Sequence, residues 1–363
     1  MVTTDKGLDE VPLETQASDD PEALFKEARR RRHRRWFIGT ILIFALSLAG
    51  ALVVSFAPRT PKPNPQPHVG LPRWTPPQGK RHPAPALLVA GDGKGGVGVY
   101  STVNGSLIRS ISPQGPGGPD QQIVLSYNRK SVFFVQPTGP CSGNILSGPL
   151  SGSSAPAPVV SDPGTLALSP APDPTSKELA WVGVACGSTG STTSSVLYIT
   201  DLATGVRADL GDFSGQHGDN EISWNSDGTR LAVESGATVA IYDTDQSSLN
   251  HVERLDVTSG CTLASPTFLS QPNEIAAIRT CYGTARTLGT SEVLVFNAAT
   301  GKPTAVVASA PHGASFQGIS VDVSGQHILL GVVTSFPPTA QNMQLEDGRL
   351  VSVSQHAPTE AEW

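Results

Sequence analysis

The polar residues of this chain that could do chemistry recur at one place in a repeated pattern, just before a short apolar stretch. Aligning the repeats puts five residues at that place: Gln122, Thr165, Glu221, Ser265 and Gln317. The loops that lead in add four more: Asp120, His217, Asp219 and His312. Carboxylates, amides and hydroxyls together predict a binding site for a small polar or cationic ligand or a peptide. The competing interpretation is that strand starts are polar because they meet solvent.

Catalysis at this place would need several acids or histidines that converge on one point. The aligned position offers one strong acid, Glu221, with Asp120 and Asp219 nearby. The chain has no G-x-S-x-G, H-E-x-x-H, EF-hand loop or GxxxxGK[ST], and its histidines lack metal-ligand spacing. We therefore expect no catalytic residues, no metal and no cofactor.

The four cysteines predict two disulfides. Cys261 and Cys281 lie at equal distances from Gln271, the centre of a predicted hairpin, so they should face one another across paired strands. Cys141 and Cys186 would then pair by elimination and join two neighbouring modules. Four cysteines allow three pairings, and free buried thiols are the alternative.

A repeated module positions all these residues. Its clearest copy is ISWNSDGTRLAVESGATVAIYDTD, from Ile222 to Asp245. The second apolar strand of each module should start near Leu87, Ser131, Glu178, Arg230, Glu274 and His327. Four-stranded modules at this spacing predict an all-β fold, a β-propeller of about six four-stranded blades over residues 87–355. The first module lacks an evident innermost strand, so the sequence leaves open how the ring closes.

One module resembles a known family. NSDGTRLAVES (Asn225–Ser235) looks like the S-P-D-G-x-x-L-A-F repeat of TolB-like and WD-repeat-like bacterial propellers, with Asp227 and Gly228 at the turn. VLYITDLATG resembles their V-x-x-x-D-x-x-T-G outer hairpin, with Asp201 and Gly205 in the matching places. The resemblance implies the propeller fold and a binding role.

The segment from Trp36 to Ala57 predicts a transmembrane helix that is retained as a signal-anchor. It has no charged residue and, at about 1.5 Å per residue, covers roughly 33 Å, enough to span a bilayer core. Six arginines precede it: Arg29, Arg30, Arg31, Arg32, Arg34 and Arg35. The positive-inside rule then places the N-terminus in the cytoplasm and the propeller outside it. A cleaved signal peptide is the competing interpretation.

Three further segments flank these elements. Residues 1–35 predict a disordered cytoplasmic tail, and residues 356–363 a C-terminal tail. Residues 58–86 hold ten prolines and five Lys/Arg without an acid, which predicts an extended Pro-rich stalk. The stalk would hold the propeller away from the membrane.

Together these features predict a single-pass plasma-membrane protein whose extracytoplasmic propeller is a non-enzymatic binding or scaffold module. Its partner would be a protein, a peptide or a cell-wall polymer, and not a nucleic acid. A propeller enzyme, such as a lactonase or a metal-dependent hydrolase with its site in the central channel, is the main alternative. A transmembrane sensor that reports through the tail is the second.

Overall fold

The structure is a computed structural model that describes residues 70–78, 80–91, 96–112, 122–139, 141–186, 192–213, 221–244, 250–282, 288–335, 338–346, 349–354 and 361–362. These residues all belong to one unit, His68–Trp363. Within them, no helix is long and apolar enough to cross a membrane. The predicted span at 36–57, its arginines and the tail at 1–35 lie outside the described residues.

The described part of the chain is built from short β-strands. The first eleven are β1 (Leu87–Gly91), β2 (Val97–Ser101), β3 (Leu107–Ser112), β4 (Ile123–Leu125), β5 (Ser131–Gly139), β6 (Ser142–Pro149), β7 (Ala157–Val160), β8 (Thr165–Pro172), β9 (Glu178–Cys186), β10 (Thr192–Asp201) and β11 (Arg207–Phe213). The next eight are β12 (Ile222–Trp224), β13 (Arg230–Ser235), β14 (Thr238–Asp243), β15 (Asn250–Arg254), β16 (Cys261–Phe268), β17 (Glu274–Tyr282), β18 (Leu288–Asn297) and β19 (Pro303–Ser309). The last five are β20 (Ala314–Val321), β21 (Ile328–Ser335), β22 (Pro338–Glu346), β23 (Arg349–Ser354) and β24 (Ala361–Glu362).

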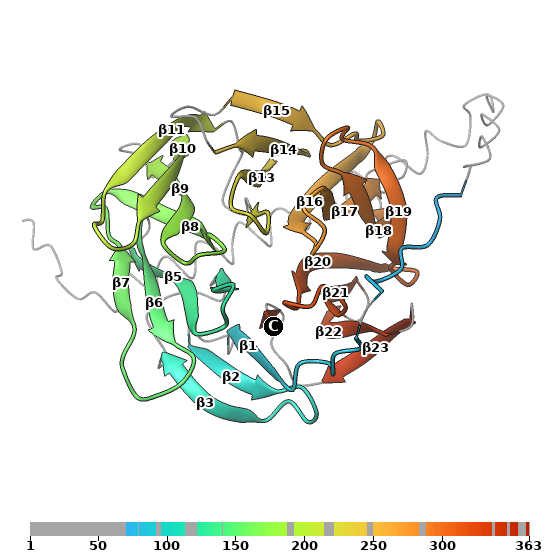
Figure 1. The fold of residues 1–363 in the computed structure, drawn as a ribbon, viewed down its shortest axis with the longest axis horizontal. Helices are drawn as coiled ribbons and strands as arrows, with labels where there is room; N and C mark the ends of the chain where they lie inside the picture. Colours follow the sequence, from blue (N-terminus) through green and yellow to red (C-terminus); the bar gives the residue numbers. More distant parts are fainter. Residues whose placement is uncertain are drawn as a thin grey trace, which may run out of the picture. The chain divides into compact units, whose positions relative to one another are not determined.

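These strands form antiparallel sheets arranged around a common centre, the architecture of a β-propeller (Figure 1). We call the sheet β24-β1-β2-β3 blade 1, and β12–β15, β16–β19 and β20–β23 blades 4, 5 and 6. Strands β4–β7 and β8–β11 form blades 2 and 3, which one parallel pair, Gly143 with Leu166, joins into a single larger sheet. The innermost strands are β4, β8, β12, β16 and β20, and β24 takes the corresponding place in blade 1.

The predicted starts of the second strands are confirmed. Five of these strands begin at the predicted residue, and β21 begins at Ile328, one residue after the predicted start. These strands were recognisable because they are continuously apolar, as in VFFV of β5 and LAWV of β9. Each lies inside a blade whose two faces pack against neighbouring blades, so both faces of the strand are buried.

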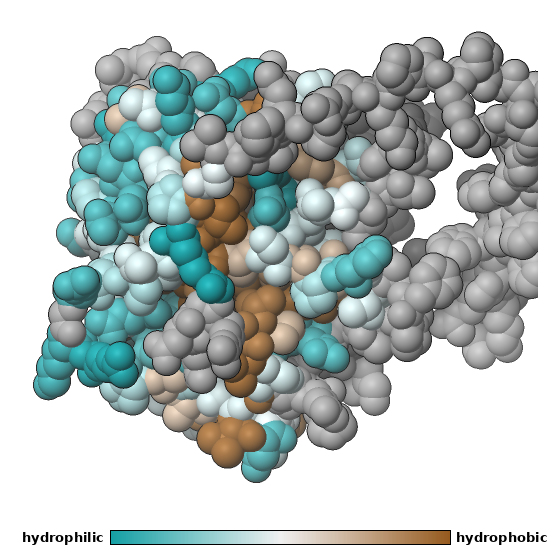
Figure 2. Space-filling model, turned by 90° about the vertical axis from the view of Figure 1, so that its right-hand side faces the viewer, coloured by the Kyte–Doolittle hydropathy of each residue, from teal (hydrophilic) through white to brown (hydrophobic). Residues whose placement is uncertain are grey.

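The core consists of apolar clusters that neighbouring blades share. One cluster joins blades 2, 3 and 4 and includes Phe133, Trp181 and Trp224. Two others join blade 4 to blade 5 and blade 5 to blade 6. Figure 2 shows the side of the molecule that carries blades 5 and 6, where a band of apolar surface runs between polar residues. Stability thus comes mainly from packing between blades.

The first predicted disulfide is confirmed. Cys261 and Cys281 are bonded to each other and stand directly opposite one another in the ladder between β16 and β17. Cys141 is also disulfide-bonded. The side chain of Cys186 lies outside the described residues, so the pairing of these two cysteines stays a prediction.

The segments before and after the predicted propeller, residues 58–86 and 356–363, both contain residues that bond to it. Ala361 and Glu362, in the stretch predicted as a C-terminal tail, pair with Ala90 and Val89 of β1. Strands from the two ends of the repeat region therefore share blade 1. At the other end, residues 71–78 and 80–86 of the predicted stalk run along the propeller, as described below.

Candidate functional site

The innermost strands of blades 2, 3, 4 and 6 end in turns that share a side-chain hydrogen-bond acceptor. In blade 4, the Asn225 Oδ1 accepts hydrogen bonds from the backbone N–H groups of Thr229 and Arg230, both at 2.9 Å. Asp173 in blade 3 and Asp322 in blade 6 accept two backbone N–H bonds in the same way, and the Ser126 hydroxyl of blade 2 accepts one. The turns therefore give a common reference height for the strands around the centre.

This height shows which residues are structural counterparts. In blades 2, 3 and 4 the residues four positions before the turn residue are Gln122, Ser169 and Glu221. In blade 5 the turn residue is Leu269, whose N–H donates to the Glu274 carbonyl, and Ser265 stands four positions before it. In blade 6 that position is Gly318, so the predicted Gln317 lies one residue before it. Ser169, and not Thr165, is thus the counterpart of Glu221. Thr165 only begins β8, because that strand extends further from its turn than β4 and β12 do.

The innermost strands of three blades are bulged at this height. The pairing register shifts at Ser169 in β8, at Ser265 in β16 and at Gln317 in β20. Ser169 and Ser265 adopt left-handed backbone angles, with φ of 54° and 51°. Each precedes a proline, and non-glycine residues in this region are strained and concentrate at functional or structurally constrained sites.

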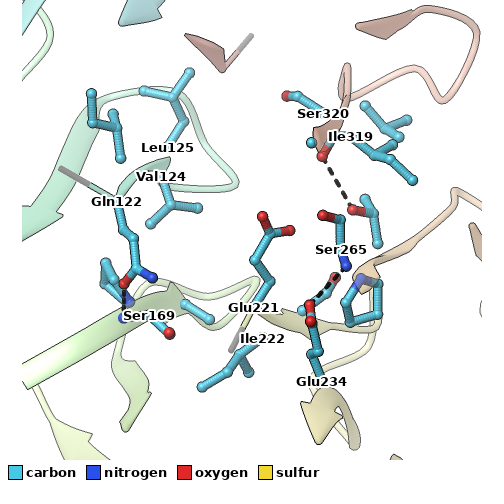
Figure 3. Close-up of a pocket in the computed structure, with 18 of the residues that line it drawn as sticks. Gln122, Val124, Leu125, Ser169, Glu221, Ile222, Glu234, Ser265, Ile319 and Ser320 are labelled. Carbon is cyan, nitrogen blue, oxygen red and sulfur yellow. Dashed lines mark hydrogen bonds between the residues drawn. The ribbon is translucent and has the colours of Figure 1, made fainter. Parts of the chain in front are cut away.

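A central cavity of about 1070 Å³ runs along these strands. Four of the predicted residues line it: Gln122, Glu221, Ser265 and Gln317. Figure 3 shows the Glu221 carboxylate directed into the space between the strands. His312 is exposed in the loop before β20 and does not line the cavity, and Asp120, His217 and Asp219 lie outside the described residues.

Hydrogen bonds between blades hold the bulges in place. The side-chain oxygen of Gln122 in blade 2 accepts the Ser169 N–H of blade 3. The Glu234 carboxylate in blade 4 accepts the Ser265 N–H of blade 5 at 2.9 Å (Figure 3). The Ser265 hydroxyl donates to the Gln317 carbonyl of blade 6 at 3.3 Å. Several lining residues therefore also join neighbouring blades.

Glu234 is a lining residue that the sequence analysis missed. Its N–H donates to the Glu221 carbonyl at 2.9 Å, because the two residues face each other where β12 pairs with β13. The hairpin register could have identified it, since Ile222 pairs with Val233 and the next pair outward is Glu221 with Glu234. Blade 4 thus contributes two carboxylates to the wall.

The cavity wall combines these acids with apolar surface. Val124, Ile222 and Ile319 lie between the polar groups. The Ser169 hydroxyl, in a residue 5% exposed, has no hydrogen-bond partner among the described residues. In the same part of the chain, no three His, Cys, Asp or Glu residues are placed to hold a metal ion. Such a wall can accept hydrogen bonds from a polar or cationic group.

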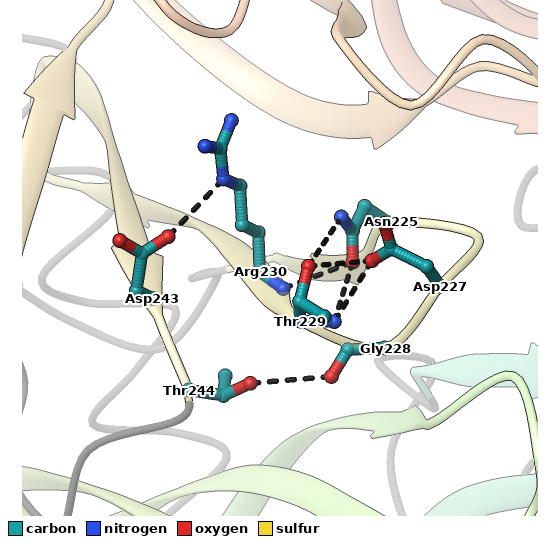
Figure 4. Close-up of polar contacts among 7 residues, drawn as sticks. All are labelled: Asn225, Asp227, Gly228, Thr229, Arg230, Asp243 and Thr244. Atoms are coloured by element: carbon teal, nitrogen blue, oxygen red, sulfur yellow. Dashed lines mark hydrogen bonds and ion pairs between the residues drawn. The ribbon is translucent and has the colours of Figure 1, made fainter.

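The turn that resembles the TolB-like repeat has a structural role. The Asp227 carboxylate accepts bonds from the Thr229 hydroxyl and N–H, at 2.5 and 3.0 Å, and Thr244 donates to the Gly228 carbonyl at 3.2 Å (Figure 4). The bond from the Thr229 hydroxyl is the main cause of a lowered pKa of Asp227. Gly228 has a φ of 74°, which an L side chain rarely adopts. These groups shape the hairpin.

Comparisons with known proteins agree with the fold. No protein-family model matches the sequence, and no curated protein matches it. Among solved structures, TolB from Acinetobacter baumannii is similar with a TM-score of 0.52 and 17% identity, over 77% of this chain and 65% of that chain. The match thus spans less than two thirds of that TolB. At this identity the likeness shows the fold alone, a TolB-like β-propeller.

Two other solved structures are similar at lower scores. A TolB candidate from Agrobacterium tumefaciens has a TM-score of 0.47 and 14% identity, over 66% of this chain and 80% of that chain. A chain of a nidogen/laminin complex has a TM-score of 0.43 and 12% identity, over 60% of this chain and 78% of that chain.

Proposed function

We propose that this chain is a single-pass membrane protein whose extracytoplasmic propeller acts as a non-enzymatic binding or scaffold module. The observation that carries the binding role is the central cavity, about 1070 Å³ in volume and lined by polar groups of five blades. Volumes of this order accommodate a small ligand or the side chains of a peptide. The site would be the part of the cavity around Glu221.

The charges of the cavity wall favour a basic partner. Glu221 and Glu234 stand together on blade 4, and with Asp322 they outnumber Arg129, the one basic residue among the described residues that line the cavity. A lysine or arginine that enters the cavity would meet carboxylates in a partly desolvated space, where a charge-assisted hydrogen bond is stronger than in water. The proposed ligand is therefore a protein or peptide segment that inserts a basic side chain.

The membrane location is supported by the sequence. The uncharged segment 36–57 follows six arginines, and all four cysteines come after it, in the part that would be exported. A propeller held there would present its cavity to extracytoplasmic proteins or to wall polymer.

The test is capture of partners from cross-linked intact cells by the full-length chain. Glu221→Gln removes one of the two carboxylate charges that blade 4 contributes to the cavity and keeps the size of the side chain. Glu253→Gln, on the outer strand β15 of the same blade, is the matched control. We expect a protein captured by the wild type and the control to be lost with Glu221→Gln. Equal capture by all three chains would contradict a site at Glu221.

A further inference from the structure

The segment that leads into the first strand crosses three blades before the propeller begins. We call its described residues, 71–78 and 80–86, the clasp. In Figure 1 it is the blue trace that passes from β19 across blade 6 to β1. Its sequence is Pro-rich, yet several of its backbone groups bond to the propeller.

The clasp is first held on the outer strand of blade 5. The Trp74 N–H donates to the Val306 carbonyl at 2.8 Å, and the Val306 N–H donates to the Pro72 carbonyl at 2.9 Å. Arg73 thus forms a parallel bridge with Val306, so the clasp extends blade 5 beyond β19. The Trp74 side chain is only 9% exposed and belongs to the apolar cluster that blades 5 and 6 share.

The clasp is then hydrogen-bonded to blades 6 and 1. The Gln326 side chain, at the turn between β20 and β21, accepts the His82 N–H at 3.0 Å and donates to the Lys80 carbonyl at 3.1 Å. Near β1, Thr102 in the turn after β2 donates its N–H to the Ala86 carbonyl at 3.0 Å. The clasp therefore connects blades 5, 6 and 1.

Among the described residues, the contact between blades 6 and 1 has the smallest apolar cluster of the ring. The apolar cluster there contains four buried residues among those described: Leu88, Ala90, Tyr100 and Leu329. Each of the other clusters is larger. Within the described residues, β24, the strand that closes blade 1, pairs with β1 through Ala361 and Glu362. Packing at this junction therefore contributes less to stability than packing elsewhere in the ring.

We propose that the clasp is a latch that keeps the propeller closed between blades 6 and 1, with Trp74 as its anchor. Because the clasp precedes β1 in the chain, a pull from the N-terminal side reaches the latch before it reaches the first strand. Release of Trp74 would free the bonds at Gln326 and Thr102, and the junction would open more often. The latch makes ring closure depend on a segment outside the blades.

Hydrogen exchange measured by mass spectrometry on the full-length chain in detergent tests this proposal. We expect Trp74→Ala to raise the exchange rates of β1, β2 and β21 roughly 10- to 100-fold, because a buried tryptophan anchor is lost. The rates in β9 and β10 should stay at the wild-type level. Gln326→Ala removes two hydrogen bonds to the clasp and should raise the exchange rates of β1, β2 and β21 several-fold.

The matched control is Trp224→Ala, which removes a tryptophan of similar burial in blade 4. It should raise the exchange rates in blades 3 and 4 and leave those of β1, β2 and β21 unchanged. If Trp74→Ala raised exchange only in the clasp and β19, the latch would be disproved. Trp74→Phe, read in the same way, decides the matter if the alanine variant fails to fold. A dimer in which the clasp docks on a second copy would also overturn the proposal.

Discussion

Replacing the turn residue Asp173 tests whether the blade turns hold the innermost strands. Asp173 is 6% exposed, and its carboxylate accepts the backbone N–H groups of Thr175, Lys177 and Glu178 at 3.0, 2.7 and 2.8 Å. Alanine would leave all three without this acceptor. The Thr175 hydroxyl donates a fourth bond to the same carboxylate, at 2.5 Å. At roughly 1 kcal/mol for each of the four bonds, with some replacement by water, we expect Asp173→Ala to lower the free energy of unfolding by about 2–4 kcal/mol.

The chain itself supplies the matched control for this change. Blade 4 has Asn225 at the place of Asp173, and its Oδ1 accepts the same two backbone bonds. Asp173→Asn should therefore keep the acceptor for Lys177 and Glu178, lose only the two bonds from Thr175, and cost about 1–2 kcal/mol.

The assay is thermal unfolding of the full-length chain, followed by far-ultraviolet circular dichroism. The alanine variant should unfold roughly 5–10 °C below the wild type, and the asparagine variant within a few degrees of it. An alanine variant as stable as the wild type, or an asparagine variant as unstable as alanine, would refute the argument that these turns act through accepted backbone hydrogen bonds.

Two further predictions concern pH and packing. Burial, with a smaller effect of the Asp173 charge, raises the pKa of Glu178 above 4.5. Its ionised form therefore opposes folding above that pH, so Glu178→Gln should be more stable than the wild type at pH 7, by no more than about 0.5 kcal/mol because the group is exposed. The gain should vanish below about pH 4; a gain that persisted there would exclude the charge as its cause. Gly183→Ala would place a Cβ 2.6 Å from the Tyr198 ring and should cost about 1–3 kcal/mol in denaturant unfolding. Gly318→Ala, with no atom within 4 Å, should be neutral, and equal losses would contradict the steric explanation.

The residues of the candidate site were predictable in blades where the apolar stretch of the sequence matches the innermost strand. Gln122 and Glu221 come directly before short innermost strands, so alignment on the apolar stretch found them. In blade 3 the innermost strand is longer and bulged, so the same alignment selected Thr165 in place of Ser169. Glu234 was missed because its place at the cavity depends on pairing across a hairpin. A bulge shifts the register without changing the apolar pattern on which the alignment relied.

The sequence by itself determined the class of fold, the starts of the second strands and the disulfide between Cys261 and Cys281. These follow from local signals: continuous apolar strands, polar turns at regular spacing, and two cysteines equally far from a hairpin centre. Only the tertiary structure decided that Ala361 and Glu362 pair with β1 and that Trp74 is buried. Both contacts join residues far apart in the chain, and no local periodicity records which distant surface such a segment meets.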